Sequence, residues 1–368
     1  TFKFVAGDVD GGAITGNFIV ERYNGSIWNP TTLVTAAATS TRAQNINLTA
    51  GTNDCYIGEP IAGFPPALGA FNAFDTTTPA GAVLGNIQTK QAGIGFTLRL
   101  VRILNNAVNT GYNQAGVTAE LYDASDNSGG YVGSTACRST WTAIAGTSQS
   151  VTFASGVVNA SFTIANVYRD VRVHIVKTGA GAGEGCSSDR FAIRLQSLTA
   201  SAHDANWQTA GTARTLNNTG ASGGNVHAAS DPAAAIPRPF TLRATPVPGT
   251  ATNYDGAPTI VSGYPTCGSL CTAVGALTYT AGSWTGTGTR ENATAHYSEA
   301  GTFNLQLEDA TYASVDSGDG SSAATRTIPA TATTEIGRFV PDRFILATNN
   351  APAFKTFNTT DGACATPP

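Results

Sequence analysis

Apolar and polar residues alternate along most of this chain. In residues 96–100 (FTLRL) and 191–195 (FAIRL), hydrophobic side chains occupy every second position. A period of two places the apolar side chains on one face of a half-buried β-strand. Residues 171–175 (VRVHI) repeat the pattern and place Arg172 and His174 on the face that points away from the core. Helical periodicity is almost absent, so the pattern predicts an all-β protein.

Turn signals separate the predicted strands. Clusters of Gly, Asn, Asp and Ser lie between the alternating stretches, and Thr, Val, Phe and Tyr are frequent within them. The dipeptide Asn24-Gly25, between residues 18–23 and 27–28, is typical of a tight β-hairpin. Many short strands joined in this way favour β-sandwich architecture.

Strand density and composition divide the chain into four parts. Residues 1–62 contain too few strand-like runs for a complete domain and are predicted to form an incomplete N-terminal β domain. Residues 63–194 and 195–344 each contain enough runs for one sandwich. Residues 345–368 begin like a new strand but are too short to complete a domain, so we expect a C-terminal strand tail.

Charge and hydrophobicity exclude two kinds of partner. Charged residues make up 12% of the chain and the net charge is −4, so there is no basic surface for nucleic acid. No run of about 20 apolar residues is present, so no membrane-spanning helix is expected. The chain begins at Thr1 and contains no Met, which predicts a processed or partial chain.

The even number of cysteines favours disulfide bonds outside the cytoplasm. The candidates are Cys55, Cys137, Cys186, Cys267, Cys271 and Cys364. Cys137 and Cys186 fall within the same predicted sandwich, and we expect them to bond to each other. Cys267 and Cys271 lie in a loop rich in Gly, Pro and Ser, where they either bond to each other or reach elsewhere. A metal site is the weaker interpretation, because no CxxC pair recurs and no His stands at ligand spacing from a Cys.

No group of residues predicts catalysis. Residues 220–224 (GASGG) match the GxSxG spacing around Ser222, but that motif needs a strand before it and a helix after it. Here it lies in a polar loop, so we expect a chance match. The histidines are scattered without motif partners, which leaves solvated or structural roles for them. They are His174, His203, His227 and His296.

We expect no cofactor, although two weaker alternatives stay open. Residues 8–12 (DVDGG) and 316–320 (DSGDG) resemble fragments of Ca²⁺ loops but lack the terminal bidentate Glu, and Asp-Gly turns explain them as well. Asn-x-Ser/Thr triplets make glycosylation an alternative, although such triplets arise by chance in a chain rich in Asn and Thr. They begin at Asn24, Asn47, Asn159, Asn217, Asn292 and Asn358.

Two long stretches resemble a known family. Residues 79–194 contain PAGAVLGNIQTKQAGIGFTLRLV, NVYRDVRVHIV and the start of CSSDRFAIRLQSL. Residues 238–344 contain RPFTLRATP, NYDGAPTI, HYSEAGTFNLQLEDATY, VDSGDG and IGRFVPDRF. Together they resemble the β-rich extracellular region of bacterial MshQ-type proteins, which are associated with the mannose-sensitive haemagglutinin (type IV) pilus system. The resemblance implies a secreted or surface-displayed bacterial protein made of tandem Ig-like sandwiches, and it supplies no active site.

The two ends of the chain also resemble parts of this family. Residues 345–364 (ILATNNAPAFKTFNTTDGAC) are similar to the start of the family's next domain, and residues 17–30 (NFIVERYNGSIWNP) to a strand–turn–strand late in such proteins. The chain thus has the beginning of one domain at its C-terminus and the end of another at its N-terminus. A strand with unpaired backbone groups is a template for another chain. We therefore expect the tail of one copy to enter the N-terminal domain of the next.

Apolar residues at the two ends are candidates for this joint. The donor side chains are Phe344, Leu346, Phe354 and Phe357, and the acceptor face consists of Phe2, Phe4, Phe18, Val20 and Trp28. Cys55 and Cys364 would lock the joint covalently. The predicted function is that of a non-enzymatic structural subunit of an extracellular bacterial filament or pilus, with copies of itself as partners. The alternative is an adhesin or pilus-tip module that binds a glycan or another surface ligand.

Overall fold

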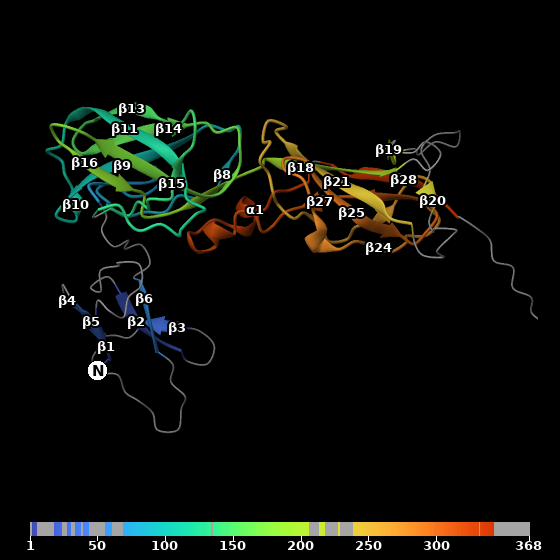
Figure 1. Ribbon diagram of the computed structural model, residues 1–368, viewed down its shortest axis with the longest axis horizontal. Coiled ribbons are helices and arrows are strands. Elements are labelled where there is room, and N and C mark those ends of the chain that lie inside the picture. The colour runs from blue at the N-terminus through green and yellow to red at the C-terminus, as the bar shows by residue number, and fades with distance from the viewer. Residues whose placement is uncertain are drawn as a thin grey trace, which may run out of the picture.

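The computed structural model describes residues 69–133, 135–204, 213–217, 238–330 and 332–341 in full, and elsewhere only the backbone of short strands. The described chain is almost entirely β, as the alternating pattern predicted (Figure 1). Its helices are single short turns: η4 (Ala281–Ser283), η5 (Ser314–Gly318) and α1 (Ala323–Arg326). No helix in the described residues is long and apolar enough to cross a membrane.

The strands from β7 to β17, here called the first strand group, pair only with one another. They are β7 Phe71–Asp75, β8 Lys90–Gln91, β9 Phe96–Leu104, β10 Ala107–Val108, β11 Gln114–Asp123, β12 Thr142–Ala143, β13 Gln149–Phe153, β14 Val157–Phe162, β15 Tyr168–Lys177, β16 Gly183–Cys186 and β17 Phe191–Arg194. One sheet has the order β10-β9-β14, with β7 also on β9. The other has the order β12-β11-β15-β17-β8, with β13 on β11 and β16 on β15.

The strands from β18 to β28 form the second strand group. They are β18 Ser197–Ala205, β19 Ala213–Thr215, β20 His227–Ala228, β21 Phe240–Val247, β22 Thr259–Ile260, β23 Thr266–Cys267, β24 Leu277–Thr278, β25 Arg290–Tyr297, β26 Gly301–Leu305, β27 Leu307–Glu308 and β28 Thr334–Val340. The sheets have the orders β19-β18-β21-β25-β24, β20-β28-β26-β23 and β22-β27. In β21 every second side chain is buried, as the period of two requires.

Two hairpin turns show why the strand ends fall where they do. Asn105 and Asn106, between β9 and β10, have φ of 52° and 59°. Asn tolerates this left-handed region better than most residues, so the pair suits a two-residue turn. Ser155 and Gly156 form the turn between β13 and β14 in the same region of φ. A Cβ on Gly156 would lie 2.3 Å from the carbonyl oxygen of Asn109, so only Gly fits there.

In the N-terminal part the structure describes strand backbones only. The strands are β1 Phe2–Val5, β2 Phe18–Tyr23, β3 Trp28–Pro30, β4 Val34–Ala37, β5 Ser40–Ala43 and β6 Tyr56–Pro60. They pair in the orders β1-β5-β4 and β3-β2-β6. The antiparallel pairing of β2 with β3 is the one that Asn24-Gly25 predicted. The predicted acceptor residues belong to β1, β2 and β3, but their side chains, like the donor residues of the tail, lie outside the described residues.

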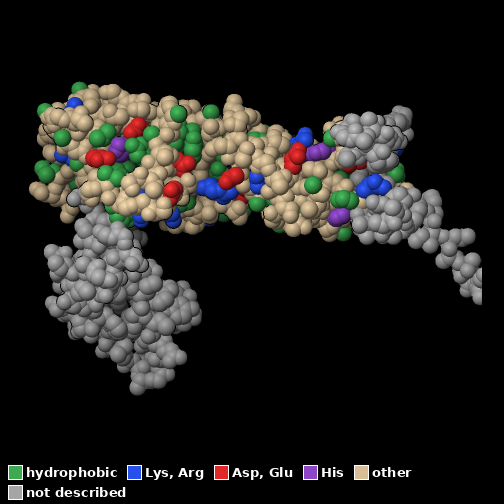
Figure 2. All heavy atoms as spheres, in the orientation of Figure 1, with side chains coloured by type: hydrophobic (Ala, Val, Ile, Leu, Met, Phe, Trp, Pro, Cys, Tyr) green, Lys and Arg blue, Asp and Glu red, His purple; other side chains and the backbone are tan. Residues whose placement is uncertain are grey.

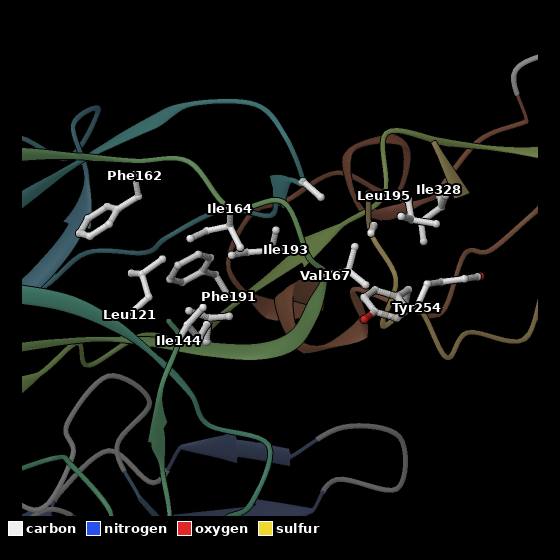
Figure 3. Close-up of a cluster of buried hydrophobic side chains, with 14 of the residues drawn as sticks. Leu121, Ile144, Phe162, Ile164, Val167, Phe191, Ile193, Leu195, Tyr254 and Ile328 are labelled. Carbon is white, nitrogen blue, oxygen red and sulfur yellow. The ribbon is translucent and has the colours of Figure 1, made fainter. Parts of the chain in front are cut away.

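Aromatic side chains fill the interior of both strand groups. In the first, the rings of Phe71 and Phe153 lie 5.5 Å apart. In the second, the rings of Tyr297 and Phe303 lie 4.3 Å apart, and Phe339 packs against both. The buried apolar residues of the two groups form one continuous cluster. Figure 3 shows part of it, where labelled side chains run from Phe162 to Ile328 without an interruption at the end of β17.

Candidate functional site

The outward face of β17 is covered, and this is where the two strand groups meet. The alternation in residues 191–195 predicts that Ala192 and Arg194 face solvent, yet Ala192 is fully buried and Arg194 is 4% exposed. The expectation of a half-buried strand was wrong here. The reason is that η5 of the second strand group packs on β17. We call this contact region, formed by residues 86–92, 164–170 and 192–196 with 252–255 and 309–328, the junction.

Asp316 of η5 lies on one side of the junction and is fully buried. Its carboxylate oxygen Oδ2 accepts a hydrogen bond from the Thr89 hydroxyl at 2.5 Å. The backbone N–H of Ala192 donates to both carboxylate oxygens, at 3.2 and 3.1 Å. A buried carboxylate that accepts hydrogen bonds from β17 and from the residue before β8 fixes η5 against the first strand group, because those donors would otherwise be buried without partners.

Burial and neighbouring charge change the acidity of this region. Burial, together with the nearby Asp319 and Asp189 carboxylates, raises the pKa of Asp316 to about 7, although the hydrogen bonds from Thr89 and Ala192 lower it. Burial likewise raises the pKa of Asp189 to about 6. Asp316 within the junction and Asp189 beside it therefore titrate near neutral pH.

Arg194 and Asn86 extend the polar contacts on the same side of the junction. The Arg194 guanidinium donates through Nε to the carbonyl oxygen of Thr325 at 2.5 Å and through Nη1 to that of Leu195 at 2.6 Å. The Asn86 side-chain amide donates to the carbonyl oxygen of Asp319 at 2.8 Å. The contacts with Thr325 and Asp319 use backbone oxygens, so they fix the path of the chain through residues 319–325.

A second set of polar contacts closes the junction near β15. Asn253 accepts a hydrogen bond from the backbone N–H of Val167 at 3.0 Å and donates to its carbonyl oxygen at 2.6 Å, as a strand partner would. Arg169 forms an ion pair with Asp255 at 3.0 Å, and its guanidinium lies 4.4 Å from the Tyr312 ring centroid. The ion pair is about half exposed and adds little stability by itself.

Between these polar contacts the junction is apolar. Val167 and Leu195 of the first strand group lie near Tyr254 and Ile328 of the second, and all four are at most 1% exposed (Figure 3). The Tyr254 hydroxyl donates to the buried Asp309 carboxylate at 2.8 Å. Burial and that carboxylate raise the pKa of Tyr254 far above its usual value. An apolar centre flanked by paired polar groups is what a permanent interface requires.

A polar groove runs along the surface of the junction. One part, a cavity of about 410 Å³, is lined by Asn86, Asp189, Arg190 and Asp319 among others. An adjoining hollow shares Arg190 and adds Asn127, Arg169 and Asp170. Charged side chains are sparse on the face of the molecule in Figure 2, so a groove with several of them is distinctive.

A separate cluster surrounds His174 on β15. The sequence placed His174 on the outward face of its strand and left solvated and structural roles open; the structure shows it 6% exposed. Its ring nitrogen Nδ1 lies 2.9 Å from Glu120 and Nε2 lies 3.0 Å from Glu184. The Tyr122 ring stacks on the imidazole, with centroids 4.5 Å apart.

The outward face of β15 is buried because a disulfide-bonded excursion covers it. Residues 124–141 leave β11 and form a small second core that contains Ala124, Ala136 and Trp141 around the disulfide. The predicted Cys137–Cys186 bond is present and ties this excursion to β16. The open alternatives for the other pair are also resolved, since Cys267 and Cys271 bond to each other. Cys55 and Cys364 lie outside the described residues.

Sequence reasoning missed this histidine cluster. Within the described residues, the one group of His, Cys, Asp and Glu side chains with ligand atoms at metal-binding separation is Cys137, His174 and Glu184, where these atoms lie within 4.8 Å of one another. The register of β15 with β16 places His174 opposite Cys186. That register was available from the sequence, because the Gly- and Ala-rich residues 178–182 are typical of a hairpin turn.

The other candidate residues are dispersed. His203 lies 3.7 Å from Glu291, while His296 is half-buried on β25. Ser222, the side chain of His227 and residues 8–12 lie outside the described residues. In residues 316–320 the Asp316 carboxylate is used in the junction, and the segment forms no metal-ligand group of the kind described above. Asp316 is thus a structural contact of the junction.

The glycosylation triplets differ in exposure. Asn159 and Asn217 are exposed. Asn292 is fully buried, and its amide donates to the carbonyl oxygen of Thr280 at 2.7 Å. Asn292 is therefore closed to a glycan in the folded chain. The triplets at Asn24, Asn47 and Asn358 lie outside the described residues.

Comparison with known proteins leaves the structure to carry the argument. The chain matches no protein-family model and no curated protein.

Proposed function

We propose that this chain is a structural, non-enzymatic subunit of an extracellular bacterial filament or pilus, related to the MshQ-type proteins that its sequence resembles. Each strand group is proposed to be an Ig-like β-sandwich, because sheets with buried apolar faces enclose its core. The single observation that carries the proposal is the junction. A buried apolar centre with paired polar groups on both sides makes the two groups one stiff piece.

Stiffness is the property that a filament subunit needs. Flexible linkers between domains allow relative motion, whereas a large hydrophobic interface suppresses it. The Cys137–Cys186 and Cys267–Cys271 bonds add cross-links suited to an oxidising environment outside the cell. These features also support localisation at the cell surface or beyond it.

Assembly is proposed to proceed head to tail by strand donation. The tail of residues 345–368 of one copy would add to the β domain of residues 1–62 of the next, so that main-chain hydrogen bonds fix register and apolar side chains fill pockets. Burial of each donor side chain would contribute about 1.5–3 kcal/mol before ordering costs.

Electron microscopy of the purified chain tests this proposal. The full chain is expected to form regular fibres, and a variant that lacks residues 345–368 is expected to stay as short rods. A second variant replaces the donor residues Phe354 and Phe357 by Ser, keeps the tail length, and is also expected to stay as short rods. Fibres of normal length from the truncated chain would exclude tail donation.

The groove along the junction favours one second candidate, the adhesin or pilus-tip module. Asn, Asp and Arg side chains offer the donors and acceptors that glycan hydroxyls require, and Asn86, Asp189 and Arg190 line the groove together. A glycan array with the full chain and with Arg190→Ala tests this. Binding that disappears in the variant would support the adhesin, whereas an array without signal would leave the structural role.

A further inference from the structure

The cluster around His174 contains the residue types that bind zinc. Its two cysteines are bonded to each other and in that state cannot act as ligands. Zn²⁺ in proteins is bound by Cys thiolates, His nitrogens and carboxylate oxygens, usually four in a tetrahedron. Cys137, His174 and Glu184 present ligand atoms within 4.8 Å of one another. Cys186, the disulfide partner of Cys137, lies directly opposite His174 in the β15–β16 pairing.

The surroundings of His174 match those of a metal-binding imidazole. Metal-bound histidines generally donate their other ring N–H to a carboxylate, which fixes the ring and its tautomer. Here Glu120 lies 2.9 Å from Nδ1, while Nε2 faces Glu184. Cys137 is 2% and Cys186 0% exposed, so the two sulfur atoms are shielded from bulk water, whereas the Glu184 side chain is 36% exposed and gives an ion a path to the site.

In the oxidised chain the two sulfur atoms are bonded to each other and carry no thiolate charge. Only Nε2 of His174 and the Glu184 carboxylate then remain as ligands, which is too few for tight binding. We propose that Cys137, Cys186, His174 and Glu184 form a redox-gated Zn²⁺ site that binds one ion when the disulfide is reduced and releases it when the disulfide forms.

The electron and proton balance is simple. A dithiol reductant gives two electrons to the Cys137–Cys186 bond, which becomes two thiols while the dithiol becomes a disulfide. Zn²⁺ then displaces the proton of each thiol, and any proton on Nε2, into solvent. In reverse, a small-molecule disulfide takes two electrons from the two thiolates and two protons from solvent, leaves as two thiols, and the ion departs into solvent.

Zinc in this place would do for the reduced chain what the disulfide does for the oxidised one. The bond ties the excursion of residues 124–141 to β16. An ion bound by Cys137 of the excursion, His174 of β15 and Glu184 of β16 links the same segments as the disulfide does. The excursion is thereby held in place before the disulfide forms.

Co²⁺ titration tests the site, because tetrahedral thiolate-bound cobalt has characteristic absorption bands. The protein is the full chain with Cys55→Ser and Cys364→Ser, reduced with a dithiol and desalted without oxygen. One equivalent of Co²⁺ is expected to bind with thiolate-to-cobalt bands, and Zn²⁺ should displace it. The oxidised protein should show no such bands.

Variants distinguish the site from general thiol binding. Replacing His174 by Gln or Glu184 by Gln should weaken Co²⁺ binding at least tenfold. The matched control, Cys267→Ser with Cys271→Ser, removes the other disulfide and should keep one full equivalent. Circular dichroism establishes that each variant is folded, and Glu184→Gln serves if His174→Gln does not fold. A reduced chain without stoichiometric binding, or unchanged spectra in a folded ligand variant, would overturn the proposal.

Discussion

Asp316 offers a quantitative test of the junction, because a buried carboxyl with a raised pKa makes stability depend on pH. The perturbation is Asp316→Asn. The Asn side chain has nearly the same shape, its oxygen can accept from the Ala192 N–H, and its amide can donate to the Thr89 hydroxyl. The variant thus keeps one hydrogen bond to each partner, with the Thr89 hydroxyl now as acceptor, and removes the titration.

The sign of the effect follows from linkage. Asp316 takes up its proton at a pKa of about 7 in the folded chain and near 3.8 in the unfolded chain. Between these values the folded state binds more protons, so stability falls as pH rises from about 4 to about 7. A carboxyl pKa raised from 3.8 to about 7 corresponds to at most about 4 kcal/mol. Asp189, with a pKa of about 6, acts in the same direction.

The assay is urea unfolding of both proteins at pH 5 and pH 8. The stability of Asp316→Asn relative to the wild type is expected to rise by about 2.5 kcal/mol between these pH values, because the rest of the effect lies below pH 5. Asp126→Asn is the matched control, because Asp126 is exposed and hydrogen bonds from Ser128 lower its pKa, so it titrates well below this range. A difference between wild type and Asp316→Asn that is the same at both pH values would refute the reasoning.

Two further predictions concern stability. Replacing Cys137 and Cys186 by Ser should lower the free energy of unfolding by about 4 kcal/mol, and replacing Cys267 and Cys271 by Ser only by about 2 kcal/mol. The difference arises because the bonds span sequence separations of 49 and 4 residues. Equal losses in urea unfolding would contradict this. Tyr254→Phe should lower the free energy of unfolding by about 1–3 kcal/mol, because the buried Asp309 carboxylate loses a hydrogen-bond donor. Tyr264→Phe removes an exposed hydroxyl contact with Thr333 and should leave the free energy of unfolding nearly unchanged in the same urea unfolding experiment.

The sequence predicted the strands well because each is a local pattern. The period of two in residues 96–100 and 171–175 placed β9 and β15 correctly, and Val171, Val173 and Ile175 are fully buried. The pairing of β2 with β3 followed from one dipeptide. These features depend on side chains only a few residues apart, which a sequence shows directly.

The parts that the sequence did not predict are those in which a distant segment covers a polar face. Ala192 and Arg194 alternate as a solvent-facing pair would, and η5 and α1, more than a hundred residues later, cover them. His174 is buried for the same reason, by the excursion of residues 124–141. Alternation states which residues share a face. It does not state what packs on that face.

Mixing two complementary truncations tests strand donation between copies. A chain without residues 345–368 keeps the proposed acceptor and lacks the donor, whereas a chain without residues 1–62 keeps the donor and lacks the acceptor. Each alone is expected to sediment as a monomer in analytical ultracentrifugation. The mixture should form a one-to-one complex that does not grow further, because no free donor and acceptor remain. A mixture in which both proteins stay monomeric, or a single truncation that forms fibres by itself, would contradict assembly by tail donation.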